Sequence, residues 1–258
     1  MILLDGDALS ERLRAGLKER VKELQMQGIT PCICTILVGD NPDSAAYIGR
    51  KHADCAALGI ASRDIRMPQD ATTQDVLDVV EGLNADPSVT GFLVQLPLPD
   101  HLNEQLISEA VSPDKEVDGL HPVNLGRLVS NSTGILPCTP SGILALLRAY
   151  EVPLAGQRVA IIGRGVLVGR PLAMLLSPKG TAATVTLLHS ASPDLASETR
   201  RADVVIADAG VPGLITADMV RPGAAVVGVG ISYDAAGHMV SDIAPDVVRV
   251  AGWATPPR

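Results

Sequence analysis

Tyr47 and Lys51 lie four residues apart and follow the cluster Pro-Asp-Ser at positions 42–44. The cluster predicts a helix that begins near Ser44, which puts both side chains on one helix face. We expect the positive end of the helix dipole to disfavour a second positive charge at Lys51, so that a desolvated lysine there exchanges protons near neutral pH. Tyr47 offers a ring face and a hydroxyl to a flat substrate. The alternative is a solvated lysine that packs over a tyrosine ring on a surface helix.

A glycine-rich turn at 163–169 follows the apolar stretch at 158–163 and precedes a second helical segment. A strand, a glycine turn and a helix start form the usual setting for a phosphate at a helix N-terminus. Gly163 and Gly165 permit a tight turn, and Gly169 permits close packing of the helix on the strand. The spacing G-x-G-x-x-x-G is one residue longer than the common dinucleotide fingerprint. The alternative is a plain turn between a strand and a helix.

The next apolar stretch ends in His189-Ser190 and carries no carboxylate. A site for NAD has an acidic residue at this place, which binds the ribose hydroxyls. Arg164 lies in the glycine turn, where its guanidinium can meet a 2′-phosphate. Both observations favour NADP over NAD, unless Arg164 only pairs with a surface acid.

Apolar strand-like and amphipathic helix-like stretches alternate along the chain. Hydrophobic residues make up 47% and aromatic residues 2%, so the core consists of Val, Ile, Leu and Ala, as in buried parallel sheets. This alternation predicts an α/β protein with mainly parallel sheets and helices on both faces. The expected helices are 8–27, 44–58, 73–83, one from about 141, and 171–177, and the expected strands are 32–39, 60–68, 91–99, 158–163, 183–189, 203–210 and 224–231.

Composition excludes several classes of partner. The net charge of −8 argues against nucleic acid, and no apolar run has the length of a membrane span. The start MILLDGDAL is too short and too acidic for a signal peptide. The four cysteines have no metal-ligand spacing, and Cys32 and Cys34 share one face of a strand. We expect a cytoplasmic protein with mostly buried, reduced thiols and no metal.

A segment rich in Pro, Asp and Gly at 112–126 predicts a domain junction. We expect a first domain over 1–118 and a second over 119–258, of which 119–150 forms the junction and a linking helix.

Several longer stretches resemble the bifunctional methylenetetrahydrofolate dehydrogenase/methenyltetrahydrofolate cyclohydrolases, the FolD family. The resemblance covers nearly the whole chain in order, and the GRGV and KHADC variants look like the actinobacterial branch. The matching stretches are TILVGDNPDSAAYIGRKHADCAALGI, GFLVQLPLP, SPDKEVDGLHPVNLGRL, PCTPSG, IIGRGVLVGRPLAMLL and, more loosely, RPGAAVVGVGIS.

The resemblance implies two α/β domains with a cleft between them, the second a Rossmann-like NADP-binding domain. It also implies a cytoplasmic homodimer that acts in one-carbon metabolism and purine biosynthesis. Methylenetetrahydrofolate would give a hydride to NADP+, and water would then open the methenyl cation to 10-formyltetrahydrofolate. A lysine that can become neutral suits a site next to that cation, because a permanent positive charge would be repelled.

The resemblance also implies roles for individual residues. Lys51 would transfer the proton in the hydrolytic step and Gln95 would hydrogen-bond it. The residues alone leave room for Gln95 to pair only with an edge strand, and for Asp118 to belong to a common Asp-Gly turn. The remaining implied roles are folate stacking for Tyr47, folate contacts for Val94 and Leu96, the pterin edge for Asp118, NADP binding for Gly163, Arg164, Gly165 and Ser190, and a place near the nicotinamide for Ile231.

The chain departs from the family at several positions. It ends at Arg258, where the family continues for about thirty residues through a P-G-G-V-G-P loop and a helix. Gly165 replaces the usual Ser, and Asp208 replaces a residue that is usually small and neutral. If Asp208 faces the cofactor, its carboxylate would repel the anionic pyrophosphate. Gly228 lies where the family has an Asp, and Ser241 lies where the family has a Gly. These departures leave open a truncated or degenerate member that binds ligands and catalyses little, whereas the matched first half argues against an unrelated NADP-dependent dehydrogenase.

Overall fold

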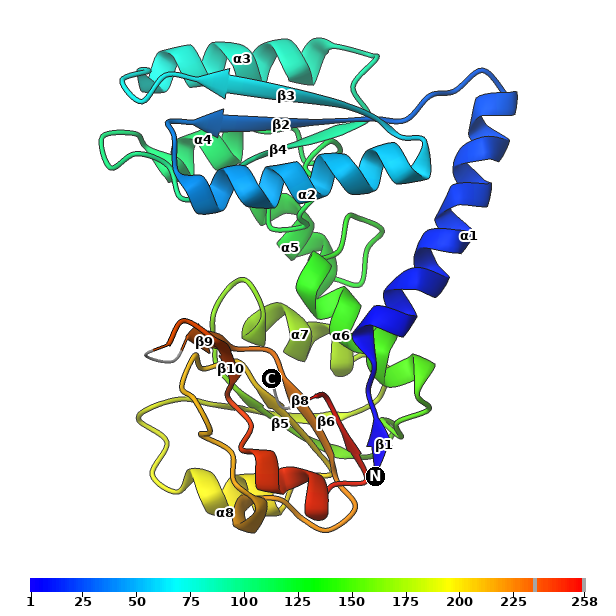
Figure 1. Cartoon of the computed structure of the whole chain (residues 1–258), viewed down its shortest axis with the longest axis vertical. Coiled ribbons are helices and arrows are strands. Elements are labelled where there is room, and N and C mark those ends of the chain that lie inside the picture. The colour runs from blue at the N-terminus through cyan, green and yellow to red at the C-terminus, as the bar shows by residue number, and fades with distance from the viewer. Residues whose placement is uncertain (234–235, 257–258) are drawn as a thin grey trace. The chain divides into compact units, whose positions relative to one another are not determined.

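A computed structural model describes residues 1–233 and 236–256 and divides the chain into two compact units (Figure 1). The three-stranded unit comprises Ser10–Arg127 and Thr133–Leu136. The six-stranded unit comprises Met1–Leu9, Leu128–Ser132 and Pro137–Arg258. This division differs from the boundary expected after residue 118, because the three-stranded unit continues to Arg127. Residues 1–9 also belong to the six-stranded unit, because the first strand of the chain pairs in parallel with the last strand.

The three-stranded unit has a parallel sheet in the order β3-β2-β4, formed by Ala61–Met67, Cys32–Val38 and Gly91–Val94. Alternate residues of β2 face different helices. Cys32 and Cys34 lie in one core with side chains of α3 (Thr73–Ala85) and α4 (Glu104–Ala110), as their shared face predicted. Thr35 points to the other face, where its hydroxyl lies 2.9 Å from the His52 ring of α2 (Pro42–Leu58). The sheet is therefore sandwiched between α2 and the pair α3 and α4.

The six-stranded unit has strands in the order β1-β11-β8-β7-β5-β6, and all neighbouring strands are parallel. Val159 and Ile161 of β5 pack with α6 and α7, whereas Ala160 and Ile162 pack in the core on the opposite face. The unit is thus a sheet with two covered faces. Its strands are β1 (Ile2–Leu3), β5 (Arg158–Ile162), β6 (Thr184–Leu188), β7 (Val204–Ala207), β8 (Ala225–Gly228) and β11 (Trp253–Ala254).

The remaining elements connect and flank the sheets. A short antiparallel hairpin pairs β9 (Ile231–Tyr233) with β10 (Met239–Ser241). Within the described residues, no helix is both long and apolar enough to cross a bilayer. The other helices are α1 (Gly6–Met26), α5 (Pro122–Val129), α6 (Cys138–Ala149), α7 (Gly169–Leu176), α8 (Leu195–Arg200) and the 3-10 turns η1 (Ala217–Met219) and η2 (Pro245–Arg249).

The predicted α/β class with parallel sheets and two domains is confirmed. The sequence patterns did not predict α4, α5 and α8 or the strands β1, β9, β10 and β11, and the ends of the predicted elements also differ. Helix α2 begins at Pro42 because the Asn41 side chain accepts hydrogen bonds from the backbone N–H groups of Asp43 and Ser44, each at 3.0 Å. Strand β4 ends at Val94, before the prolines that cannot donate to a sheet.

Candidate active site

Helix α2 carries Tyr47 and Lys51 on neighbouring turns, as predicted. The expectation that the helix dipole acts on Lys51 is wrong, because the helix begins at Pro42 and places Lys51 in the third turn, beyond the reach of the dipole. The alternative of a lysine over the tyrosine ring is also not what the structure shows. The cation above the Tyr47 ring is Arg50, whose guanidinium carbon lies 4.7 Å from the ring centroid.

The end of β4 brings Gln95 to Lys51. The backbone N–H of Gln95 donates to Ile36 O at 2.9 Å, which continues the sheet pattern by one residue. The side-chain Oε1 of Gln95 accepts a hydrogen bond from Lys51 Nζ at 3.4 Å, and its Nε2 donates to Leu96 O at 2.8 Å. The amide of Gln95 is therefore held from both ends, and the carbonyl oxygen is the atom that faces the lysine.

Asp118 belongs to the same cluster. Burial raises the pKa of its carboxyl group, the positive charge of Lys51 acts in the opposite direction, and the negative charge of Glu116 raises the pKa further. Asp118 also lines a cavity of about 90 Å³ together with Val94 and Leu96. The structure thus gathers Lys51, the segment 94–96 and Asp118 in one unit.

Two buried carboxylates were not singled out from the sequence. Glu116 lies under the loop that carries Asp118, and Asp242 is fully buried in the six-stranded unit, where its carboxylate accepts hydrogen bonds from the backbone N–H groups of residues 209–211. The sequence carries no clear signal for either burial, because Glu116 lies between Lys115 and Val117 in a charged segment and Asp242 lies between Ser241 and Ile243. His121 lies beside Glu116 at the start of α5, where its Nδ1 accepts from Val123 N at 3.1 Å.

The glycine turn after β5 has the tight backbone that its sequence predicted. Gly163 has φ +126°, and a Cβ there would collide with Asp208 O. A Cβ on Gly169 would collide with Gly163 O, so this glycine permits the close approach of α7 to the turn. Gly165 has open space around it, so its lack of a side chain is not required by packing.

The residues expected to favour NADP over NAD, Arg164 and Ser190, lie beyond the carboxyl ends of β5 and β6. Arg164 and Ser190 are both exposed, and Ser190 follows β6 after one residue. A backbone cradle that a Cβ would fill, an exposed guanidinium beside it and a strand end without a carboxylate fit a nucleotide with a 2′-phosphate. These residues lie in the six-stranded unit, whereas the lysine cluster lies in the three-stranded unit.

Asp208 lies directly against this cradle. Its backbone N–H donates to Ile162 O at 2.7 Å, and its Cβ would lie 3.3 Å from a Cβ on Gly163. Burial raises the pKa of its carboxyl group, and the negative charge of Asp242 raises it further. The backbone and Cβ of Asp208 are therefore adjacent to the turn that would receive phosphate.

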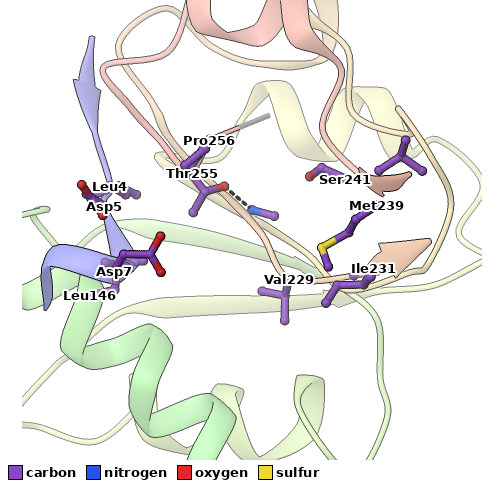
Figure 2. A pocket seen from close by; sticks show the side chains of 14 residues that line it. Leu4, Asp5, Asp7, Leu146, Val229, Ile231, Met239, Ser241, Thr255 and Pro256 are labelled. Carbon is purple, nitrogen blue, oxygen red and sulfur yellow. Dashed lines mark hydrogen bonds between the residues drawn. The ribbon is translucent and has the colours of Figure 1, made fainter. Parts of the chain in front are cut away.

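Ile231 is exposed on β9 and lines a cavity of about 270 Å³ at the carboxyl end of β8 (Figure 2). Val229, Ile231 and Met239 line one side of the cavity, and Leu4, Asp5 and Asp7 line the other (Figure 2). A cavity at the carboxyl end of parallel strands is the usual place for a ligand in an open α/β sheet.

Comparisons with known proteins identify the family to which both halves of the chain belong. Residues 4–118 match the family model for the tetrahydrofolate dehydrogenase/cyclohydrolase catalytic domain, and residues 137–258 match the model for the NAD(P)-binding domain of the same family. The chain is similar to the bifunctional FolD dehydrogenase/cyclohydrolase of Campylobacter jejuni, with 43% identity, 99% of this chain and 91% of that chain covered, and a TM-score of 0.96.

Two further solved structures extend the similarity. The FolD of Trypanosoma brucei, solved with NADP and an inhibitor, is 35% identical over 99% of this chain and 90% of that chain, with a TM-score of 0.90. A methylenetetrahydrofolate dehydrogenase of the silkworm Bombyx mori is 35% identical with the same coverage and a TM-score of 0.92. The expected dehydrogenase and cyclohydrolase functions and the NADP cofactor are confirmed at the level of the family. The chain belongs to the tetrahydrofolate dehydrogenase/cyclohydrolase family.

Proposed function

We propose that this chain oxidises 5,10-methylenetetrahydrofolate with NADP+ and hydrolyses the methenyl product to 10-formyltetrahydrofolate. The observation that carries the proposal is the contact between Lys51 and Gln95 beside Asp118, within the unit that matches the catalytic domain. We further propose that the protein works in the cytoplasm as a homodimer and that its product supports purine biosynthesis.

In the oxidation, the chain binds and orients the two reactants. Tyr47 stacks on the folate, and the Asp118 carboxylate accepts hydrogen bonds from the N–H groups at the pterin edge. In the six-stranded unit, the turn from Gly163 to α7 receives the pyrophosphate and Arg164 meets the 2′-phosphate. NADP+ held by these residues would supply the acceptor for the hydride of the methylene carbon, and the oxidation needs no protein acid or base.

In the hydrolysis, Lys51 moves the proton. Neutral Lys51 accepts a proton from the water that attacks the methenyl carbon, and the bond from that carbon to N5 then breaks. Lys51 passes this proton to N5 and becomes neutral again, and the hydroxyl on the carbon loses the second water proton to solvent as the formyl group forms on N10. Gln95 positions the lysine amine through its Oε1, and the methenyl cation itself favours the neutral amine beside it.

The test uses the purified 258-residue chain. Methenyl formation from methylenetetrahydrofolate is followed with NADP+ and, separately, with NAD+, and the decay of supplied methenyltetrahydrofolate is followed without cofactor. We expect turnover in both assays and a preference for NADP+. A folded sample that is silent in both assays would contradict the proposal.

A second candidate is a degenerate member that binds ligands without catalysis. Asp208 favours it, because a carboxylate against Gly163 opposes the anionic pyrophosphate. Titration of NADP+ by calorimetry separates the two candidates when read beside the turnover assays. Binding without turnover supports the second candidate, and binding with turnover supports the first.

A further inference from the structure

Glu116 is a buried acid whose carboxylate is fully engaged by N–H groups. The residue is 8% exposed. Its Oε1 accepts from the backbone N–H of Asp118 at 2.7 Å, and its Oε2 accepts from the backbone N–H of His121 at 3.3 Å and from Asn124 Nδ2 at 3.3 Å. A buried carboxylate costs much free energy unless it is hydrogen-bonded, so these three donors account for its presence below the surface.

The carboxylate ties the loop to the start of helix α5. Asn124 is fully buried, and its Nδ2 also donates to Pro113 O at 2.8 Å. His121 accepts from Val123 N through Nδ1 at 3.1 Å, and its Nε2 lies 3.2 Å from Glu109 O, which suits a neutral ring with the proton on Nε2. The donors to Glu116 are themselves held in place.

The other side of the loop is fixed to β4. Glu116 forms a parallel bridge with Phe92, and Phe92 N donates to Lys115 O at 2.8 Å. Lys115 Nζ donates to Leu83 O at 2.9 Å and to Asp86 O at 2.7 Å. Strand β4, which ends just before Gln95, therefore also holds the loop that contains Asp118. Glu116 connects the backbone of this loop both to β4 and to the start of α5.

We propose that Glu116 is a positioning residue that fixes the backbone at Asp118, so that the Asp118 carboxylate points at the pterin edge of the folate. This inference rests on the proposed function, which gives Asp118 its role. The charged groups that act on Asp118 are Lys51 and Glu116. The negative charge of Glu116 raises the pKa of the Asp118 carboxyl, so loss of that charge lowers it.

The test compares Glu116→Gln with Asp114→Asn, a control on the same loop whose side chain is 79% exposed and pairs with Arg127. A glutamine has one oxygen, so it cannot accept from Asp118 N and also from His121 and Asn124. We expect E116Q to raise the KM for methylenetetrahydrofolate about tenfold, the scale of one hydrogen bond to a charged group, with kcat changed less than about twofold. NADP+ affinity should stay unchanged, and D114N should match the wild type.

A double-mutant cycle with Asp118→Asn distinguishes positioning from independent effects. We expect E116Q to change the folate KM little once Asp118 is already Asn. Full additivity of the two KM effects would overturn the inference. If D118N alone leaves the KM unchanged, the role of Asp118 in the proposed function fails, which is a different result from additivity.

The pH profile gives a readout that a purely structural role would not move. Ionised Asp118 is the form that accepts hydrogen bonds from the pterin, so kcat/KM for the folate rises as Asp118 loses its proton. We expect this rise to occur at lower pH in E116Q than in the wild type or D114N, and an unshifted profile would overturn the inference. If E116Q fails to unfold cooperatively, the same cycle and profile are measured with Glu116→Asp, which keeps the charge; we then expect a raised KM with a smaller displacement of the profile.

Discussion

Lys51 Nζ donates a hydrogen bond to Gln95 Oε1 over 3.4 Å, between a helix and a strand end that are 44 residues apart in the chain. The Nε2 of the same amide donates to Leu96 O, so Oε1 is the atom of Gln95 that faces Lys51. This arrangement suits a lysine whose amine must keep one position while it gains and loses a proton.

Gln95→Leu removes that acceptor while keeping a similar volume. We expect hydrolysis of methenyltetrahydrofolate to slow about tenfold or more, because a hydrogen bond to a charged group contributes roughly 1.5–3 kcal/mol, and we expect a smaller change in hydride transfer. Both rates are measured on one protein preparation. Gln74→Leu, at an exposed position on α3 where the side chain pairs with Asp78, is the matched control and should leave both rates unchanged.

Ser241 fills the space that a side chain at position 228 would need. A Cβ on Gly228 would lie 2.5 Å from Ser241 Oγ and 3.0 Å from Ile243 Cδ1. We expect Gly228→Ala to lower the free energy of unfolding by about 1–3 kcal/mol through overpacking, and Ser241→Gly in the same chain to restore part of it. Urea unfolding of the single and double variants measures the coupling. Gly82→Ala is the control, because a Cβ at this position in α3 meets no atom within 4 Å, and it should raise the free energy of unfolding slightly. If Gly228→Ala and the double variant lose the same free energy of unfolding, the steric conflict between residues 228 and 241 is refuted.

Asp208 is expected to weaken cofactor binding. Asp208→Ala removes a negative charge beside Gly163, so the Kd for NADP+ should fall roughly fivefold, about 1 kcal/mol, the interaction of two unit charges about 4 Å apart in water. Because burial and Asp242 raise the pKa of Asp208, wild-type affinity should decline as rising pH ionises this carboxyl, and the variant should lose this dependence. Asp218→Asn makes the same charge change at η1, and its Kd should equal that of the wild type.

Asp118 should reduce stability at neutral pH. Its pKa is raised in the folded protein, chiefly by burial, so the native state holds this proton more tightly than the unfolded chain does. Stability should therefore fall as pH rises from the unfolded pKa of about 3.9 through the folded value. We expect Asp118→Asn to unfold at higher denaturant concentration than the wild type at pH 7, with the difference shrinking towards pH 4. A constant difference across this range would show that the substitution acts through packing.

Local sequence signals predicted much of the fold. The alternation of apolar stretches predicted β2, β3 and β4 of the three-stranded sheet and β5, β6, β7 and β8 of the six-stranded sheet, but neither β1 nor β11. The strand-turn-helix order around Gly163 predicted a tight turn that the structure confirms with φ +126°. Element ends were less predictable, because they depend on which side chain caps the helix. Asn41, rather than the residues after Pro42, accepts the first N–H groups of α2.

Long-range contacts were beyond such signals. The pairing of Lys51 with Gln95 was expected only from the family resemblance, since nothing local links a helix residue to a strand end 44 positions later. No local pattern predicted that Gly228 and Ser241 are in contact, although each is a separate departure from the family. The assignment of residues 1–9 to the six-stranded unit depends on the pairing of β1 with β11.

The central claim is that Lys51 carries the hydrolytic proton and is dispensable for hydride transfer. Lys51→Met keeps the length of the side chain and removes the amine. The decisive measurement is the ratio of cyclohydrolase to dehydrogenase rates in this variant and in the wild type, with NADP+ as the cofactor. We predict that hydrolysis falls at least about a hundredfold while hydride transfer keeps most of its rate, within the range that general acid–base catalysis contributes. Equal loss of both rates in a folded variant would contradict the account, because Lys51 would then serve binding or structure.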